Sequence, residues 1–85
     1  MWYTYVLQSQ KNNRLYVGYT SDLKRRFIEH NQKRGGAYTS KNGPYNLVFY
    51  EAYLKKEDAC RSELFYKTGY GREVLRGKLK TFFEK

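Results

Sequence analysis

The N-terminal half of the chain alternates between short stretches rich in aromatic and β-branched residues and polar, turn-forming stretches. Residues 2–8 and residues 15–20 both have the composition of β-strands. The polar segment 11–14 that joins them is typical of a turn. We therefore expect a β-hairpin, with Tyr5 and Tyr16 on the same face if the connection is even in length and unbulged.

The spacing of apolar residues after the hairpin predicts a helix at residues 23–31. Residues 20–22 offer an N-terminal cap immediately before it. Leu23 and Phe27 are four positions apart and can face a core together, with Ile28 beside them. The helix should therefore pack against one face of the hairpin.

Three further elements are predicted in the second half of the chain. Residues 45–54 are strongly β-prone, and residues 55–68 have a helical pattern with acidic residues in the first turn. Gly69-Tyr70-Gly71 is expected to end that helix, and a last helix is expected at residues 72–83. Its buried side would consist of Val74, Leu75, Leu79 and Phe82.

The element order β-β-α-β-α-α predicts an α+β fold with a three-stranded, mainly antiparallel sheet and flanking helices. The chain has 85 residues without an internal repeat or linker, so we expect a single domain over 1–85. Within the helix at 55–68, Cys60 and Leu64 should form an apolar stripe beside the one that carries Glu63.

The charge balance narrows the choice of partners. With 17 Lys+Arg against 8 Asp+Glu, the formal charge is +9, which attracts polyanions. Nucleic acid is the commonest such partner and an anionic membrane surface the next, while a solubility role without a partner is the bland alternative. A single cysteine excludes an internal disulfide framework and a cysteine-rich zinc site. The chain start resembles no signal peptide and no stretch approaches a membrane span, so we expect a cytoplasmic protein. We also expect a monomer.

Five side chains supply the chemistry that phosphodiester cleavage requires. Cleavage needs a group that takes a proton from water, cations around the phosphate and usually a metal held by a carboxylate. Arg26 and His30 share one face of their helix, and His30 is the only histidine. The full set is Tyr5, Tyr16, Arg26, His30 and Glu63.

Each of these residues also has a plain structural interpretation. The tyrosines could be ordinary strand aromatics, and Arg26 and His30 could be surface groups. Glu63 could simply pair with Lys67 at i, i+4. The ordered set is therefore more informative than any single residue.

The ordered set resembles a GIY-YIG nuclease domain over roughly residues 2 to 75. The first motif keeps only its tyrosine, because Tyr3-Thr4-Tyr5 stands where Gly-Ile-Tyr is usual. The second is close, Tyr16-Val17-Gly18, and the arginine, histidine and glutamate of the family match Arg26, His30 and Glu63. More narrowly, the chain is similar to small stand-alone bacterial members related to the N-terminal domain of the excision-repair endonuclease.

This resemblance implies a role for each residue. Glu63 would hold one Mg²⁺ or Mn²⁺, Arg26 would grip phosphate oxygens, and Tyr5 would position the water or the phosphate. Tyr16 would orient the attacking water. Either Tyr16 or His30 would take its proton, a choice that the sequence leaves open. The expected substrate contacts are Gly18, Arg25, Asn31, Tyr38, Thr39 and Lys67.

The leading hypothesis is a metal-dependent endonuclease with low sequence specificity and some selectivity for branched, flapped or single-stranded structure. DNA is favoured over RNA as its substrate, a choice that the sequence leaves open. The alternatives are a nucleic-acid-binding module that does not cut, and a subunit that brings the fold to a larger repair complex. A pure binder has no need of a carboxylate that repels phosphate, which favours the nuclease.

Overall fold

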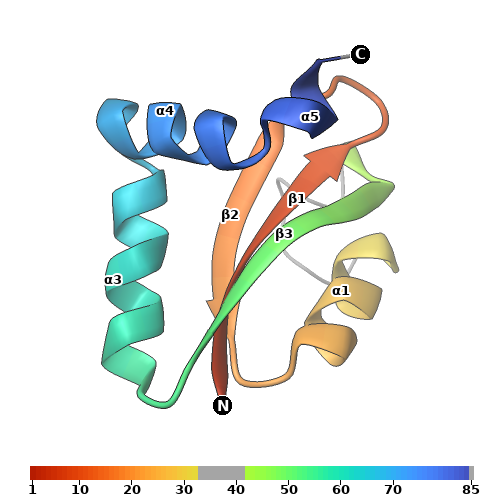
Figure 1. Ribbon diagram of the computed structural model, residues 1–85. Coiled ribbons are helices and arrows are strands. Elements are labelled where there is room, and N and C mark those ends of the chain that lie inside the picture. The colour runs from red at the N-terminus through yellow and green to blue at the C-terminus, as the bar shows by residue number, and fades with distance from the viewer. Residues whose placement is uncertain (33–41, 85) are drawn as a thin grey trace.

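The computed structural model describes residues 1–32 and 42–84. The elements run in the order β-β-α-β-α-α, followed by a short terminal helix (Figure 1). Their bounds are β1 Trp2–Ser9, β2 Leu15–Thr20, α1 Leu23–Asn31, β3 Tyr45–Tyr53, α3 Lys56–Tyr66, α4 Gly69–Lys78 and α5 Lys80–Phe83. The α+β class and the element order predicted from the sequence are confirmed.

The sheet has three strands in the order β2-β1-β3, and both pairs are antiparallel. In the hairpin, Tyr5 pairs with Gly18 and Leu7 pairs with Tyr16. Directly opposed residues share a face, and residues two apart on a strand share it as well. Tyr5 and Tyr16 therefore lie on one face, as predicted. The register shift in the sheet lies between β1 and β3, at Val6/Leu7, and does not disturb the hairpin.

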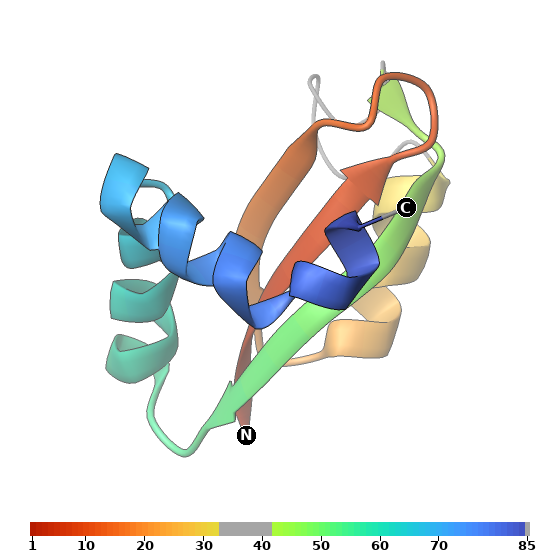
Figure 2. The ribbon, with the colours of Figure 1, turned by 45° about the horizontal axis from the view of Figure 1, so that its top comes forward.

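The helices cover opposite faces of the sheet. On the face of α1, a core of Tyr5, Leu7 and Tyr45 packs against Leu23 and Phe27. The other face packs against α3 and α4 through Val6, Val17, Tyr66 and Leu75. Figures 1 and 2 both show α1 on one side of the sheet and α3 with α4 on the other. No helix within the described ranges is long and apolar enough to cross a membrane.

A carboxylate on β3 fastens α3 to the sheet. Glu51 accepts hydrogen bonds of 2.8 Å from the hydroxyls of Tyr53, Ser62 and Tyr66. Burial alone would raise the pKa of Glu51, but these three bonds and the charge of Lys78 outweigh it, so that the pKa is lowered. Burial and, after it, the hydrogen bond to the Glu51 carboxylate raise the pKa of Tyr66. Glu51 thus fixes the helix that carries Glu63.

Three details of the predicted helices are wrong. Ile28 is 42% exposed and does not join Leu23 and Phe27 in the core. Leu64 is 59% exposed, because α3 turns the stripe of Ala59 and Tyr66 toward the sheet. The period of 3.6 residues fixed the spacing but not which of two adjacent stripes faces inward.

The third error concerns the start of α4. No loop at residues 69–71 separates α3 from α4, because α4 already begins at Gly69. Thr68 is its N-cap, and the Thr68 side chain accepts a hydrogen bond from the Gly71 N–H. A β-carbon at Gly71 would clash with the Phe65 carbonyl, so glycine permits the tight junction of α3 and α4. The last predicted helix is divided into α4 and α5 at Leu79.

Candidate active site

The central phenol lies against a strand that has no side chain in its way. A β-carbon at Gly18 would stand 2.5 Å from Tyr5 Oη and 2.6 Å from Tyr5 Cζ. Only glycine permits so close an approach. The Tyr5 ring therefore lies over the backbone of β2, and its exposed fraction is 1%.

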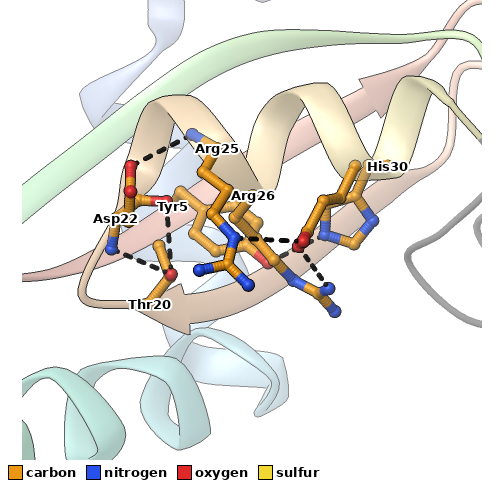
Figure 3. A network of polar contacts seen from close by, with 7 residues as sticks. Tyr5, Thr20, Asp22, Arg25, Arg26 and His30 are labelled. Atoms are coloured by element: carbon orange, nitrogen blue, oxygen red, sulfur yellow. Dashed lines mark hydrogen bonds and ion pairs between the residues drawn. The ribbon is translucent and has the colours of Figure 1, made fainter.

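The N-terminal cap of α1 positions the next two residues. Asp22 Oδ1 accepts a 3.1 Å hydrogen bond from the Arg25 N–H, and Thr20 Oγ1 accepts one of 3.1 Å from the Asp22 N–H. These bonds fix the first turn of α1. Arg26 and His30, one turn apart, then lie close to Tyr5 (Figure 3).

His30 is buried between the two phenols. Its Nε2 lies 2.9 Å from Tyr5 Oη, and its ring centroid lies 5.1 Å from that of Tyr16. Burial, with a smaller contribution from the charge of Arg26, lowers the pKa of His30 to about 4. At neutral pH the imidazole is uncharged. The interpretation of His30 as a surface residue is wrong, because its exposed fraction is 1%.

The phenol of Tyr5 is a proton donor at neutral pH. Burial raises its pKa to about 12, although a hydrogen bond from Arg26 opposes the change. A guanidinium can only donate, so Tyr5 Oη accepts from Arg26 and can donate its own proton to His30 Nε2. His30 Nδ1 has no hydrogen-bond partner among the described residues, which is uncommon for a buried polar atom.

Glu29 orients the two arginines of α1, a role that the sequence prediction missed. Its carboxylate pairs with Arg25 Nε at 3.2 Å and with Arg26 Nη1 at 3.3 Å. The hydrogen bonds from Arg25 and Arg26 lower the pKa of Glu29. The i, i+3 and i, i+4 spacings were the signal that could have revealed it. The Arg26 side chain remains 30% exposed, so it can contact a ligand while held.

Glu63 comes from the opposite side of the sheet. It lies on α3, its side chain is 14% exposed, and its Oε2 accepts a 2.8 Å bond from Lys67 Nζ. Its negative charge nevertheless raises the pKa of Tyr5, so the carboxylate lies within electrostatic range of that phenol. The structure thus gathers Tyr5, Arg26 and His30 directly and brings Glu63 near them from α3.

A divalent metal fits this arrangement only as a site with one carboxylate. No group of three or more His, Cys, Asp or Glu side chains that could hold a metal occurs in residues 1–32 and 42–84. Mg²⁺ commonly takes one or two carboxylates, keeps several waters and binds substrate phosphates. Glu63 can supply that carboxylate, and the Lys67 ammonium competes with the metal ion for it.

The remaining predicted contacts are spread more widely. The side-chain amide of Asn31 is bonded to the backbone of Tyr45, donating to O at 3.1 Å and accepting from N at 2.6 Å. It thereby joins the end of α1 to the start of β3, and its role toward substrate stays a prediction. Tyr38 and Thr39 lie outside the described residues.

Comparison with known proteins defines the class. Residues 1–77 match the model of the GIY-YIG catalytic domain, and the chain therefore belongs to the GIY-YIG family. It is a nuclease superfamily whose members generally bind nucleic acid and use divalent metal ions.

Similar proteins are small as well. The chain is 42% identical over 65 residues to the UPF0213 protein SAG0778 of Streptococcus agalactiae, covering 76% of this chain and 73% of the relative. The identity to the UPF0213 protein SpyM50708 of Streptococcus pyogenes is also 42% over 65 residues, covering 76% and 70%. The solution NMR structure of the UPF0213 protein BH0048 from Bacillus halodurans matches with a TM-score of 0.55 at 35% identity, covering 91% of this chain and 84% of that one.

Proposed function

We propose that this protein is a metal-dependent endonuclease that hydrolyses phosphodiester bonds in DNA with low sequence specificity. One observation carries the proposal: Arg26, Tyr5 and His30 form a hydrogen-bonded cluster, with the Tyr16 ring against it, in a chain of the GIY-YIG family. A buried imidazole and phenol beneath a partly exposed guanidinium suit a site that binds an anion and moves a proton.

The different exposure of Tyr5, Tyr16, Arg26 and His30 suggests a different role for each side chain. Arg26 is partly exposed and Tyr16 is half-buried, so we assign Arg26 to the non-bridging phosphate oxygens and Tyr16 to the attacking water. Tyr5 and His30 are buried and support them. A phenol with a pKa of about 12 stays protonated at neutral pH, so Tyr5 is not the base. We assign uptake of the water proton to Tyr16 or His30, of which Tyr16 is the more exposed.

Glu63 is the proposed metal ligand, and Lys67 and Arg25 are proposed phosphate contacts. The bound ion would polarise the scissile phosphate and stabilise the leaving oxygen. Lys67 Nζ is 2.8 Å from the Glu63 carboxylate, so it can move to a phosphate when a cation takes its place.

The test is plasmid nicking by purified protein with Mg²⁺ or Mn²⁺. Nicking should occur with wild type, and Glu63→Ala should abolish it while DNA binding is largely kept. Glu57→Ala, an exposed carboxylate on the same helix, is the matched control and should nick like wild type. Equal nicking by wild type and Glu63→Ala would indicate a contaminant and overturn the proposal. Flapped, junction and RNA substrates then define the preference.

A binding module that does not cut is the second candidate. The Glu63–Lys67 ion pair favours it, because a carboxylate held by lysine is less accessible to a metal. Binding without cleavage across several metals and all substrates would support this candidate, including its role as a subunit of a larger repair complex. Salt sensitivity does not separate the two, since both bind phosphates.

A further inference from the structure

A cavity of about 660 Å³ lies beside the candidate active site, along strand β2. It is lined by the turn before β2, the end of α3, and helices α4 and α5. Tyr16 belongs both to this wall and to the cluster around His30. Lys67, the partner of Glu63, also lines it. The cavity and the candidate active site therefore share two residues, Tyr16 and Lys67.

The wall of the cavity is cationic. Besides Lys67, it contains Arg14, Arg72 and Arg76, and the two last residues are one helical turn apart on α4. Within the described part of the chain, none of these three arginines is paired with a carboxylate. Their guanidinium groups can therefore bind phosphates without first breaking an ion pair.

Aromatic rings accompany the cations. Tyr16 and Phe83 both line the cavity, and the Arg76 guanidinium carbon lies 5.0 Å from the centre of the Phe83 ring. A positive groove with aromatic side chains is the usual arrangement for single strands, whose bases stack on the rings while cations follow the backbone. The volume of the cavity falls in the range of about 300–1,000 Å³ typical of small-ligand sites, which suits a few nucleotides and not a duplex.

We propose that this cavity binds a single strand of nucleic acid adjoining the phosphate at the active site, with Arg72 and Arg76 on its backbone and Phe83 against a base. The inference rests on the proposed function, since it places the scissile phosphate beside Tyr16. The protein would then prefer substrates in which a single strand leaves a duplex, such as flaps.

The test measures binding of a short labelled single strand and a blunt duplex in EDTA, so that nothing is cut. Arg72→Gln with Arg76→Gln should weaken single-strand binding about tenfold and reduce the slope of log K against log salt by about 1.4, or about 0.7 per lost phosphate contact. Phe83→Leu should weaken it about fivefold or more without changing the slope. Lys55→Gln with Arg61→Gln, which removes the same charge from exposed positions outside the cavity, is the control and should have a small effect. Circular dichroism verifies that all variants are folded.

The outcomes separate this inference from the proposed nuclease. Equal losses in the cavity and control variants, or equal losses for single strand and duplex, would overturn the cavity assignment even if wild type nicks DNA. A selective loss of single-strand binding would support it even if no metal gives cleavage, and the nuclease proposal would then fail alone. Retained single-strand binding together with nicking of flaps by the cavity variant would also overturn it.

Discussion

At the scale of single residues, Gly18 determines where the central phenol can lie. The Tyr5 ring occupies the volume that a side chain at position 18 would fill, and from there it reaches His30 at 2.9 Å. The hydrogen bond and the burial of both rings depend on this one missing β-carbon. The glycine was predicted from its motif, whereas the reason for it became clear only from the strand register.

Gly18→Ala should therefore damage both stability and activity. The new methyl group forces the Tyr5 ring to move, which overpacks the core and costs about 1–3 kcal/mol of unfolding free energy. A displacement of about 1 Å at the catalytic groups can reduce the cleavage rate about 100-fold. Urea unfolding and nicking measure the two effects.

Gly77→Ala is the matched control. Beyond its chain neighbours and the backbone of its own helix, no heavy atom lies within 4 Å of a β-carbon at this position in α4. Because glycine disfavours a helix interior by about 0.5–1 kcal/mol relative to alanine, the control should be slightly stabilised. Equal effects of the two substitutions would show that the close approach of Tyr5 to Gly18 has no importance.

The buried imidazole predicts a pH dependence of stability. The pKa of His30 is about 4 in the folded chain against an ordinary value of 6.5, so the unfolded chain takes up the proton first as the pH falls. The stability associated with neutral His30 is complete above about pH 6.5 and is lost toward pH 4. We expect the unfolding free energy of wild type to fall by about 1.5 kcal/mol between about pH 6.5 and pH 5.

His30→Gln should be less stable at pH 7 but nearly insensitive to pH in that window. Urea titrations at several pH values test this. Glu51 and Glu29 have lowered pKa values, so their contributions change only below about pH 4.5 and do not interfere. Parallel pH profiles for wild type and His30→Gln would contradict the assignment.

At the scale of elements, Glu51 explains how α3 is held on the sheet. The carboxylate accepts hydrogen bonds from Tyr53 on its own strand and from Ser62 and Tyr66 on α3. Glu51→Gln removes the charge and provides an amide that cannot accept all three bonds. Since a hydrogen bond to a charged group contributes about 1.5–3 kcal/mol, we expect a loss of about 2 kcal/mol and a Tm lower by about 10 °C.

Glu73→Gln serves as the control for this prediction, because Glu73 is exposed on α4 and should change stability by less than about 0.5 kcal/mol. The pKa of Glu51 is lowered, so the contribution of its charge is present above about pH 4.5 and is lost at lower pH. Wild type and Glu51→Gln should therefore become more alike in stability as the pH falls below this value. A constant difference would contradict the role of the charge.

The elements that sequence patterns predicted well are those defined by local signals. Strands β1 and β2 follow from composition, and α1 from its cap at Asp22, which the structure confirms. The start of α4 was missed because glycines were taken as a stop, although Thr68 caps a new helix at the same point. Which stripe of α3 faces the sheet depends on tertiary contacts, such as the bond from Thr4 Oγ1 to the Ala59 carbonyl, that no local pattern contains.

At the scale of the whole molecule, the candidate site combines groups from both sides of one sheet. The sequence predicted that Tyr5, Arg26 and His30 lie together, and they do, while their part in catalysis stays a prediction. It could not show that α3, with Glu63, packs on the face opposite α1, because element order alone does not assign helices to faces. Strand β2, which carries Tyr16 and Gly18, is an edge strand of this sheet.

A double-mutant cycle tests whether these groups from two faces act on one phosphate. Arg26→Lys keeps the positive charge but loses the planar guanidinium group that can bind two phosphate oxygens at once. Glu63→Gln keeps the shape of the side chain but loses its negative charge. Residues that act as a unit have non-additive effects on cleavage. The double variant should therefore nick little more slowly than the less active of the two single variants. Arg26→Lys combined with Arg61→Gln, a surface change on α3, should instead give the product of the separate effects. Multiplicative losses for Arg26 with Glu63 would mean that the guanidinium and the carboxylate serve separate steps, and the single-site arrangement would have to be abandoned.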